Sequence, residues 1–208
     1  MSSAQIDNLR DRSVLAQLIE SVAPEKASIL SDALLTEFGS IGRILSETEE
    51  SLQRVVGAQS AVINLLIATE KLIIAQFQNE LPKKLISSTD EKLIRYLQAS
   101  MGSLATETMR IFFLDTANHL IKDQIFGHGS PSKVIVQPRS ILKRALELNA
   151  SALIMVHNHP GGNVKPSKSD VNFTMRIKIL CQELEIKLHD HIVITGSSWS
   201  SFRKMKLL

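Results

Sequence analysis

The amino-acid sequence predicts an α/β chain of the α+β type, in which a small all-α bundle precedes a mixed sheet flanked by helices. In residues 4–80 the apolar side chains recur at helical spacing, with no strand-like alternation. From about Ser87 onward, short apolar or alternating runs that are typical of strands take turns with helical segments. We therefore expect two domains, residues 1–82 and residues 83–208.

The two expected domains differ in net charge. Residues 1–82 contain six Lys+Arg and eleven Asp+Glu, a net charge of −5, whereas residues 83–208 contain eighteen and ten, a net charge of +8. The two values add up to the +3 of the whole chain. Such an asymmetry indicates two domains with different surfaces, and it leaves open weak binding of nucleic acid by the basic second domain.

The composition also indicates in which cellular compartment the protein is expected. The N-terminal stretch lacks the apolar core of a signal peptide, and no run was expected to reach the length of a membrane span. The single cysteine excludes a disulfide framework and a Cys-rich zinc site. We expect a cytoplasmic protein that does not contact a membrane, in which Cys181 is a small buried hydrophobic residue.

Apolar spacing defines the helices of the first domain. A first helix has four apolar residues on one face: Val14, Leu15, Leu18 and Ile19. A second helix is expected to begin near Pro24, to include Ile29 in its apolar set and to end at Gly39. Two short segments and one long helix follow, over residues 41–45, 46–55 and 60–79.

The second domain is expected to combine strands with helices. Strands are predicted over residues 106–115, 120–126, 152–156, 186–195 and 199–202, with a short extended piece at 134–136. Helices are predicted from Thr89 or Asp90 to Leu97, from Pro138 to about Asn149, and after Asp170. The last helix has five apolar residues expected in the core: Val171, Met175, Leu180, Cys181 and Leu184.

One stretch, ALIMVHNHPGGNVKPSKSD, contains the residues of a metal site. His157 and His159 end the apolar run, and residues two apart in a strand point to the same face. Ser167 is a good N-cap residue and Asp170 lies three residues later, in the first turn of the following helix. Two imidazoles and one carboxylate leave a coordination position for water, so we predict that His157, His159 and Asp170 bind Zn²⁺.

The motif His-x-His-Pro followed by Ser-x-x-Asp resembles the JAMM motif of MPN-type metalloproteases. Five blocks resemble the RadC family in order: IFFLDTANHLI, QPRSILKRALELNA, LIMVHNHP, PSKSD and HDHIVI. The resemblance covers residues 85–208 firmly and the first eighty residues loosely. Gly161 departs from the family, which usually has Ser after His-Asn-His-Pro; the departure concerns loop contacts and not the metal ligands.

The resemblance implies an MPN-type fold and a zinc-dependent hydrolase that cleaves an amide bond, either peptide or isopeptide. Glu107 matches the family's glutamate that acts on the metal-bound water, and would be the general acid and base. Ser167 matches a serine of the motif and would stabilise the oxyanion, although a role as helix cap alone explains it equally well. The substrate, an unknown protein or peptide, is not specified by the sequence, and a homodimer is left open.

Other histidines repeat the metal-site pattern. His189 and His191 also form a His-x-His pair, but no acidic helix start lies near them in the sequence. We expect them to have structural roles or to support the metal ligands from behind. His119 and His128 lie in predicted loops, where solvated side chains are the default.

Three alternative functions share features with this sequence. The letters His-Asn-His suggest an HNH nuclease, but that motif distributes its residues over a ββα unit. Two histidines and a carboxylate also form the facial triad of non-haem iron oxygenases, yet nothing resembles their many-stranded jelly roll. The remaining alternative is a DNA-repair or DNA-processing accessory protein, a function attached to the RadC family, that binds nucleic acid without protease activity.

The first domain contains a degenerate helix-hairpin-helix region. The stretch SLQRVVGAQSAVINLLIATEKL resembles this DNA-binding element, whose glycine-rich turn offers backbone N–H groups to a phosphate. Family members have Gly-x-Gly in the turn, whereas this chain has Gly57, Ala58 and Gln59. Side chains at the last two positions obstruct the close approach of a phosphate. We therefore interpret the hairpin as a structural remnant.

We predict that residues 1–82 alone bind duplex DNA no better than a generic acidic protein. Their net charge is −5, and six Lys+Arg supply few cations for counterion release. Gel-shift titrations of the two halves at about 50 and 200 mM salt would test this. Any DNA binding of the full chain should survive removal of the bundle. Tight binding by residues 1–82 that is lost on Gly57→Val would contradict the prediction.

Overall fold

Two compact units make up the chain, Met1–Gln76 and Phe77–Leu208. They are seen in a computed structural model that describes residues 3–82, 90–128 and 136–208. Thr89 and most of the predicted extended piece at 134–136 lie outside the described residues. The division falls a few residues before the predicted boundary between residues 82 and 83, which stays a prediction.

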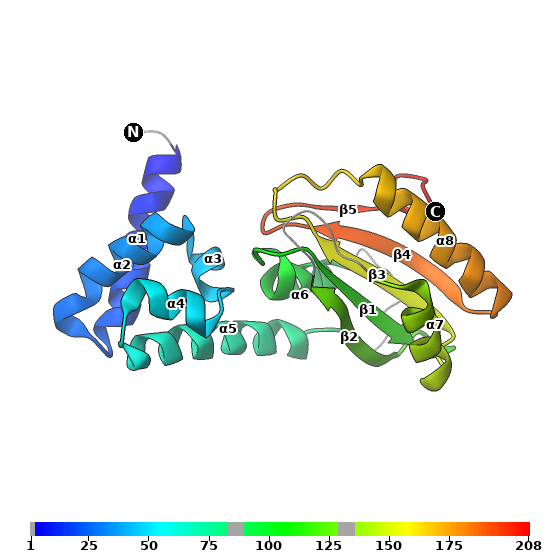
Figure 1. The fold of residues 1–208 in the computed structure, drawn as a ribbon, viewed down its shortest axis with the longest axis horizontal. Coiled ribbons are helices and arrows are strands. Elements are labelled where there is room, and N and C mark those ends of the chain that lie inside the picture. Colours follow the sequence, from blue (N-terminus) through cyan, green and yellow to red (C-terminus); the bar gives the residue numbers. More distant parts are fainter. Residues whose placement is uncertain (1–2, 83–89, 129–135) are drawn as a thin grey trace. The chain divides into compact units, whose positions relative to one another are not determined.

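The first unit is all-helical (Figure 1). Its elements are α1 (Ser3–Glu20), the 3₁₀ turn η1 (Pro24–Lys26), α2 (Ala27–Phe38), α3 (Ile41–Leu45), α4 (Glu49–Val56) and α5 (Ser60–Asn79). Gly39 ends α2 with a positive φ of 83°, and its N–H donates to the Leu35 carbonyl, as the sequence predicted. Gly57, with φ 65°, separates the helices of the predicted hairpin, α4 and α5.

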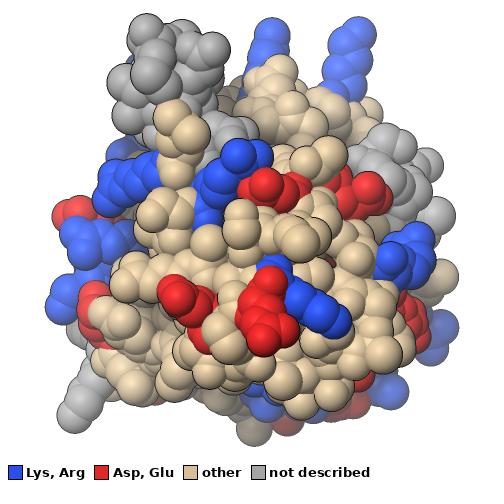
Figure 2. All heavy atoms as spheres, turned by 90° about the vertical axis from the view of Figure 1, so that its left-hand side faces the viewer, with Lys and Arg blue, Asp and Glu red and all other residues tan. Residues whose placement is uncertain are grey.

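The core of this unit uses a narrower helix face than predicted. Leu15 and Ile19 of α1 are fully buried, but Val14 is 51% exposed. Ile29 of α2 is 71% exposed, although its neighbour Leu30 is buried. Adjacent residues differ by about 100° around a helix, so only one of each apolar pair faces the bundle. The visible face of this unit intersperses acidic and basic side chains among larger uncharged areas (Figure 2).

Helix α5 departs from the expectation that no run reaches the length of a membrane span. By length and composition alone this 20-residue helix could cross a bilayer, and 17% of its most apolar window is buried inside the structure. One helix of this kind is weak evidence of a span. The predicted cytoplasmic location stays a prediction.

The second unit contains a five-stranded mixed sheet, which confirms the predicted α+β class. The sheet order is β2-β1-β3-β4-β5; β3 and β4 are parallel and the other neighbours antiparallel. The strands are β1 (Thr108–Leu114), β2 (Leu120–His128), β3 (Ala152–Asn158), β4 (Lys187–Ile194) and β5 (Trp199–Ser201). The helices are α6 (Glu91–Met101), which Asp90 caps, α7 (Pro138–Glu147) and α8 (Lys168–Glu183).

Helices cover both faces of the sheet. α7 and α8 pack on the face that carries Ile111 and Met155, in one buried cluster with Ile177 and Cys181 (Figure 1). α6 lies on the opposite face, where the Tyr96 ring meets Phe112 edge-on. The sheet is thereby buried on both faces. This explains why β1 and β3 are apolar along most of their length and do not alternate between apolar and polar residues.

The buried stripe of α8 differs from the prediction. Thr174, Ile177 and Cys181 are fully buried, at spacings of three and four residues, whereas Met175 and Leu184 are 37% and 39% exposed. Val171 and Leu180 are half-buried. Cys181 is confirmed as a buried residue, and burial raises the pKa of its thiol to about 11. Thr174 and Ile177 are core residues that the sequence did not predict.

Gly102, just after α6, lies close to backbone atoms of other residues, so a substitution there tests how tightly this part of the unit is packed. A Cβ atom at Gly102 would lie 2.7–2.9 Å from backbone atoms of Gln98, Thr195 and Gly196. We expect Gly102→Ala to lower the free energy of unfolding by about 1–3 kcal/mol, because backbone atoms cannot yield as a flexible side chain can. Gly161→Ala is the matched control, since nothing lies within 4 Å of its Cβ position. Equal denaturation midpoints for both variants would contradict the packing described.

Candidate metal centre

Strand register brings the site residues together. β1 runs antiparallel to β3 with Met109 beside His157, so Glu107, just before β1, lies at the end of β3. The first turn of α8 adds Asp170 from the same face of the sheet. Glu107, His157, His159 and Asp170 each offer one ligand atom, and these atoms all lie within 4.8 Å of one another. The residues that the sequence singled out therefore form one cluster.

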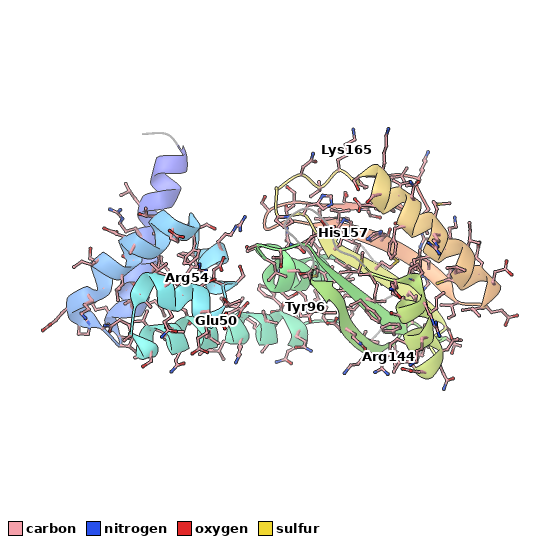
Figure 3. All side chains as sticks on the ribbon, viewed as in Figure 1. Glu50, Arg54, Tyr96, Arg144, His157 and Lys165 are labelled. Carbon is pink, nitrogen blue, oxygen red and sulfur yellow. The ribbon has the colours of Figure 1, made fainter. Side chains whose placement is uncertain are left out.

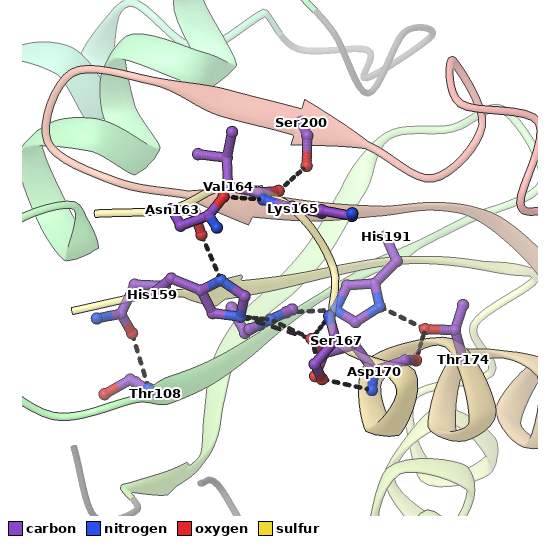
Figure 4. A network of polar contacts seen from close by, with 12 residues as sticks. Thr108, His159, Asn163, Val164, Lys165, Ser167, Asp170, Thr174, His191 and Ser200 are labelled. Atoms are coloured by element: carbon purple, nitrogen blue, oxygen red, sulfur yellow. Dashed lines mark hydrogen bonds and ion pairs between the residues drawn. The ribbon is translucent and has the colours of Figure 1, made fainter. Parts of the chain in front are cut away.

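The start of α8 fixes the carboxylate. Ser167 is the N-cap, and its side chain accepts a hydrogen bond from the Asp170 backbone N–H at 3.1 Å. Asp170 Oδ2 accepts in return from the Ser167 backbone N–H and from its hydroxyl, both at 2.7 Å. This reciprocal capping box is drawn in Figure 4. The predicted cap is confirmed, and the hydroxyl proton of Ser167 is directed at Asp170.

Two imidazoles face each other across the site. His157 Nε2 and His159 Nε2 are 2.9 Å apart, and Asp170 Oδ2 lies 3.6 and 3.5 Å from them. The Nδ1 atom of His159 lies 2.6 Å from the Asn163 carbonyl oxygen, which can only accept, so Nδ1 carries the proton (Figure 4). The Nε2 atom of a neutral His159 is then an unprotonated lone pair aimed into the cluster.

The charge balance of the cluster favours a cation. Burial opposes ionisation of Asp170, but the His157 and His159 imidazoles, which can donate to the carboxylate when they are protonated on Nε2, outweigh burial and hold the pKa of the carboxyl well below its usual range. The Asp170 carboxylate can accept a proton-bearing Nε2 of His159 and thereby raises the pKa of His159. A carboxylate beside two nitrogen lone pairs at 2.9 Å needs a positive charge between them. These donors fit a divalent metal ion such as Zn²⁺, although they do not specify which metal.

Access to the cluster is one-sided. His157 lies within the second unit and is fully buried, whereas Lys165 points outward from the loop before α8 (Figure 3). The side chains of His159 and Asp170 are 19% and 13% exposed, and Glu107 is half-buried. Solvent therefore reaches the cluster from the side of His159 and Asp170.

Asn158, between the two histidines, is a site residue that the sequence reasoning missed. It is fully buried, and its Oδ1 accepts from the Thr108 backbone N–H at 2.7 Å. Its Nδ2 donates to the carbonyls of Leu104 and Thr106 at 3.3 and 3.1 Å. Asn158 thus holds the chain on both sides of Glu107. Only the pairing of β1 with β3 reveals this contact, which joins residues fifty positions apart.

The second His-x-His pair lies outside the cluster. His191 is fully buried and its Nε2 lies 2.8 Å from His157 Nδ1, on the side away from the ligand atoms. Burial lowers the pKa of His191 well below its ordinary value. The Nε2 atom of His189 lies 2.7 Å from Asn118 Oδ1 instead. The expectation of structural and supporting roles agrees with both positions. His119, expected to be solvated, is exposed and pairs with Asp115.

Comparison with known proteins decides the family. Residues 86–207 match the family model described as a RadC-like JAB domain. The chain belongs to the RadC family. It is 39% identical over 186 residues to a UPF0758 protein of Ruegeria pomeroyi, covering 89% of this chain and 83% of the relative. A UPF0758 protein of Rhodobacter capsulatus is 36% identical over 191 residues, covering 92% and 89%. Neither name states an activity.

We predict that this RadC-family chain binds one Zn²⁺ with an affinity that falls as pH is lowered. Metal binding requires deprotonated ligands, and the pKa of His159 is raised, so zinc must displace a proton below that pKa. The affinity is full above the raised pKa and should fall about tenfold per pH unit below it. Calorimetry in two buffers would count the protons released.

Two histidine variants, one of a proposed ligand and one of a histidine outside the cluster, test whether zinc binds at this site. His159→Asn should weaken zinc binding by more than about 100-fold, because a ligand is lost. His189→Asn should leave affinity and proton release unchanged, since its hydrogen bond is to Asn118. Zinc binding that is insensitive to both substitutions would show that the metal binds elsewhere.

Proposed function

We propose that this RadC-family protein is a zinc-dependent hydrolase that cleaves an amide bond of a protein or peptide. The observation that supports this most is the position of Glu107, whose carboxylate joins two histidines and Asp170 within 4.8 Å. The half-buried Glu107 is the fourth residue of the cluster, and a three-ligand zinc site does not need it as a ligand. It is the group that such a site requires for proton transfer.

His157, His159 and Asp170 would hold the metal, which supplies Lewis acidity and lowers the pKa of a water molecule to about 7. Glu107 accepts the proton of the attacking water and returns it to the leaving nitrogen. Asn158 keeps Glu107 at the cluster through its hydrogen bonds to Thr106 and Thr108. The partial exposure of His159 and Asp170 admits the substrate carbonyl.

Ser167 is proposed to stabilise the oxyanion only after a rearrangement. Its hydroxyl donates to Asp170 Oδ2 at 2.7 Å and accepts from the Asp170 N–H. A metal ion that binds Asp170 would compete for the same oxygen, and the hydroxyl proton would become available to a substrate oxygen. The role as helix cap does not depend on this change.

Amide hydrolysis is favoured over cleavage of a phosphodiester. Among residues 3–82, 90–128 and 136–208, one cluster of three or more His, Cys, Asp or Glu side chains could hold a metal ion. Nuclease schemes commonly use two metal ions about 3.5–4 Å apart, for which this part of the chain offers no second set of ligands. A role as a DNA-processing accessory protein rests on the family resemblance and on the +8 charge of residues 83–208 alone.

We expect Glu107→Gln to lower kcat for hydrolysis of a peptide library by about 10²–10⁴-fold while leaving zinc affinity near that of the wild type. The amide keeps the shape of the side chain but cannot accept the proton of water. Glu183→Gln, on the exposed end of α8, is the control and should change neither quantity. Full activity of the Glu107 variant would exclude the proposed mechanism.

A further inference from the structure

A buried chain of hydrogen bonds links two of the proposed metal ligands through residues outside the cluster. It runs from His157 on β3 to His191 on β4, then to Thr174 on α8, and ends at the backbone carbonyl of Asp170. Figure 4 labels the last three of these residues. The three contacts measure 2.8, 2.6 and 2.6 Å. His157, His191 and Thr174 are all fully buried, so no water can substitute for any member.

The direction of this chain follows from its last member. The Asp170 carbonyl oxygen can only accept, so the single hydroxyl proton of Thr174 is donated to it. Thr174 Oγ1 must then accept from His191 Nδ1–H. A neutral His191 with its proton on Nδ1 has a lone pair on Nε2, which accepts from His157 Nδ1–H.

The direction of this chain also determines which nitrogen of His157 carries a proton. His157 has its proton on Nδ1, so Nε2 of the neutral ring is an unprotonated lone pair aimed at His159 Nε2 and Asp170 Oδ2. The opposite direction would place two acceptors, Thr174 Oγ1 and the Asp170 carbonyl oxygen, 2.6 Å apart with no proton between them. The His191 ring plane is held independently, because it stacks on buried Phe202 at 4.7 Å and 21°.

We propose that Thr174 and His191 are positioning residues that fix the tautomer of His157 and couple it to the helix turn that carries Asp170. Neither touches the ligand atoms. They act by ensuring that His157 presents a metal-binding nitrogen before any metal arrives, and by fixing the start of α8 relative to β3. The functional importance of this hydrogen-bond chain rests on the proposed metal site. The directions of its hydrogen bonds do not depend on that site.

The first test reads tautomers directly in the metal-free, full-length chain. Long-range ¹H–¹⁵N correlation spectra of protein with ¹⁵N-labelled histidine rings report which nitrogen carries the proton. We expect both His157 and His191 to be protonated on Nδ1. In Thr174→Val, which keeps the shape but lacks the acceptor, an Nε2-protonated form of both rings should appear. Thr174→Ser should restore the wild-type pattern. A wild-type His191 protonated on Nε2 would overturn the proposal.

The control is Thr195→Val, which also removes a buried threonine hydroxyl in this unit but one that bonds only to Ser198. It should lower stability without changing either tautomer. An unchanged tautomer pattern in Thr174→Val would likewise refute the proposal. Should Thr174→Val fail to fold, the spectra of the wild type and of Thr174→Ser still decide the direction of the chain.

A second readout separates this proposal from the proposed function. Zinc affinity should fall about 10–100-fold in Thr174→Val and stay near wild type in Thr174→Ser and Thr195→Val. A wild-type chain that binds no zinc would refute the proposed zinc-dependent hydrolase. The tautomer spectra would still test the directions of the hydrogen bonds. Zinc binding in Thr174→Val as tight as in the wild type would refute the positioning role even if the tautomers were as described.

Discussion

The site depends on where α8 begins. Ser167 and Asp170 close a capping box that fixes the first helical turn, and this turn lies against the end of β3. Packing of Ile177 and Cys181 into the sheet holds the rest of the helix, so the carboxylate cannot move away from the histidines without uncovering core. The same three hydrogen bonds that stabilise a helix start also present a metal ligand.

Buried polar groups are numerous around this contact, and each has a partner. Asn158 uses both polar atoms of its side chain on residues 104–108, and His191 bridges β3 and α8. Asp190, fully buried, accepts from the backbone N–H groups of His191 and Arg203. Leaving any of these unpaired would cost about 1–3 kcal/mol, so the polar network specifies one arrangement of strands and helix.

The sequence predicted much of this arrangement because local patterns encode it. Strand periodicity placed His157 and His159 on one face, and the spacing from Ser167 to Asp170 predicted a capped helix. What local patterns do not contain is strand register. The contacts of Asn158 with Thr108, and of His191 with Thr174, join residues 50 and 17 positions apart. Their residue types are ordinary in a strand or helix, so only the tertiary pairing reveals their roles.

The helical unit shows a second limit of local patterns. Val14 and Ile29 satisfy an apolar helical pattern as well as their buried neighbours do, yet both are exposed. Which side of a broad apolar face is buried depends on how neighbouring helices cross, and spacing within one helix does not determine this. The same holds for α8, where polar Thr174 is buried and apolar Met175 is not.

Anomalous diffraction at the zinc edge would show whether one metal ion is held between β3 and the start of α8. In crystals grown with zinc, we expect a single strong peak about 2.0–2.1 Å from Nε2 of His157 and of His159 and about 2.0–2.2 Å from an Asp170 oxygen. A zinc peak on other residues, or these three ligand atoms well separated in crystals grown with excess zinc, would contradict the account.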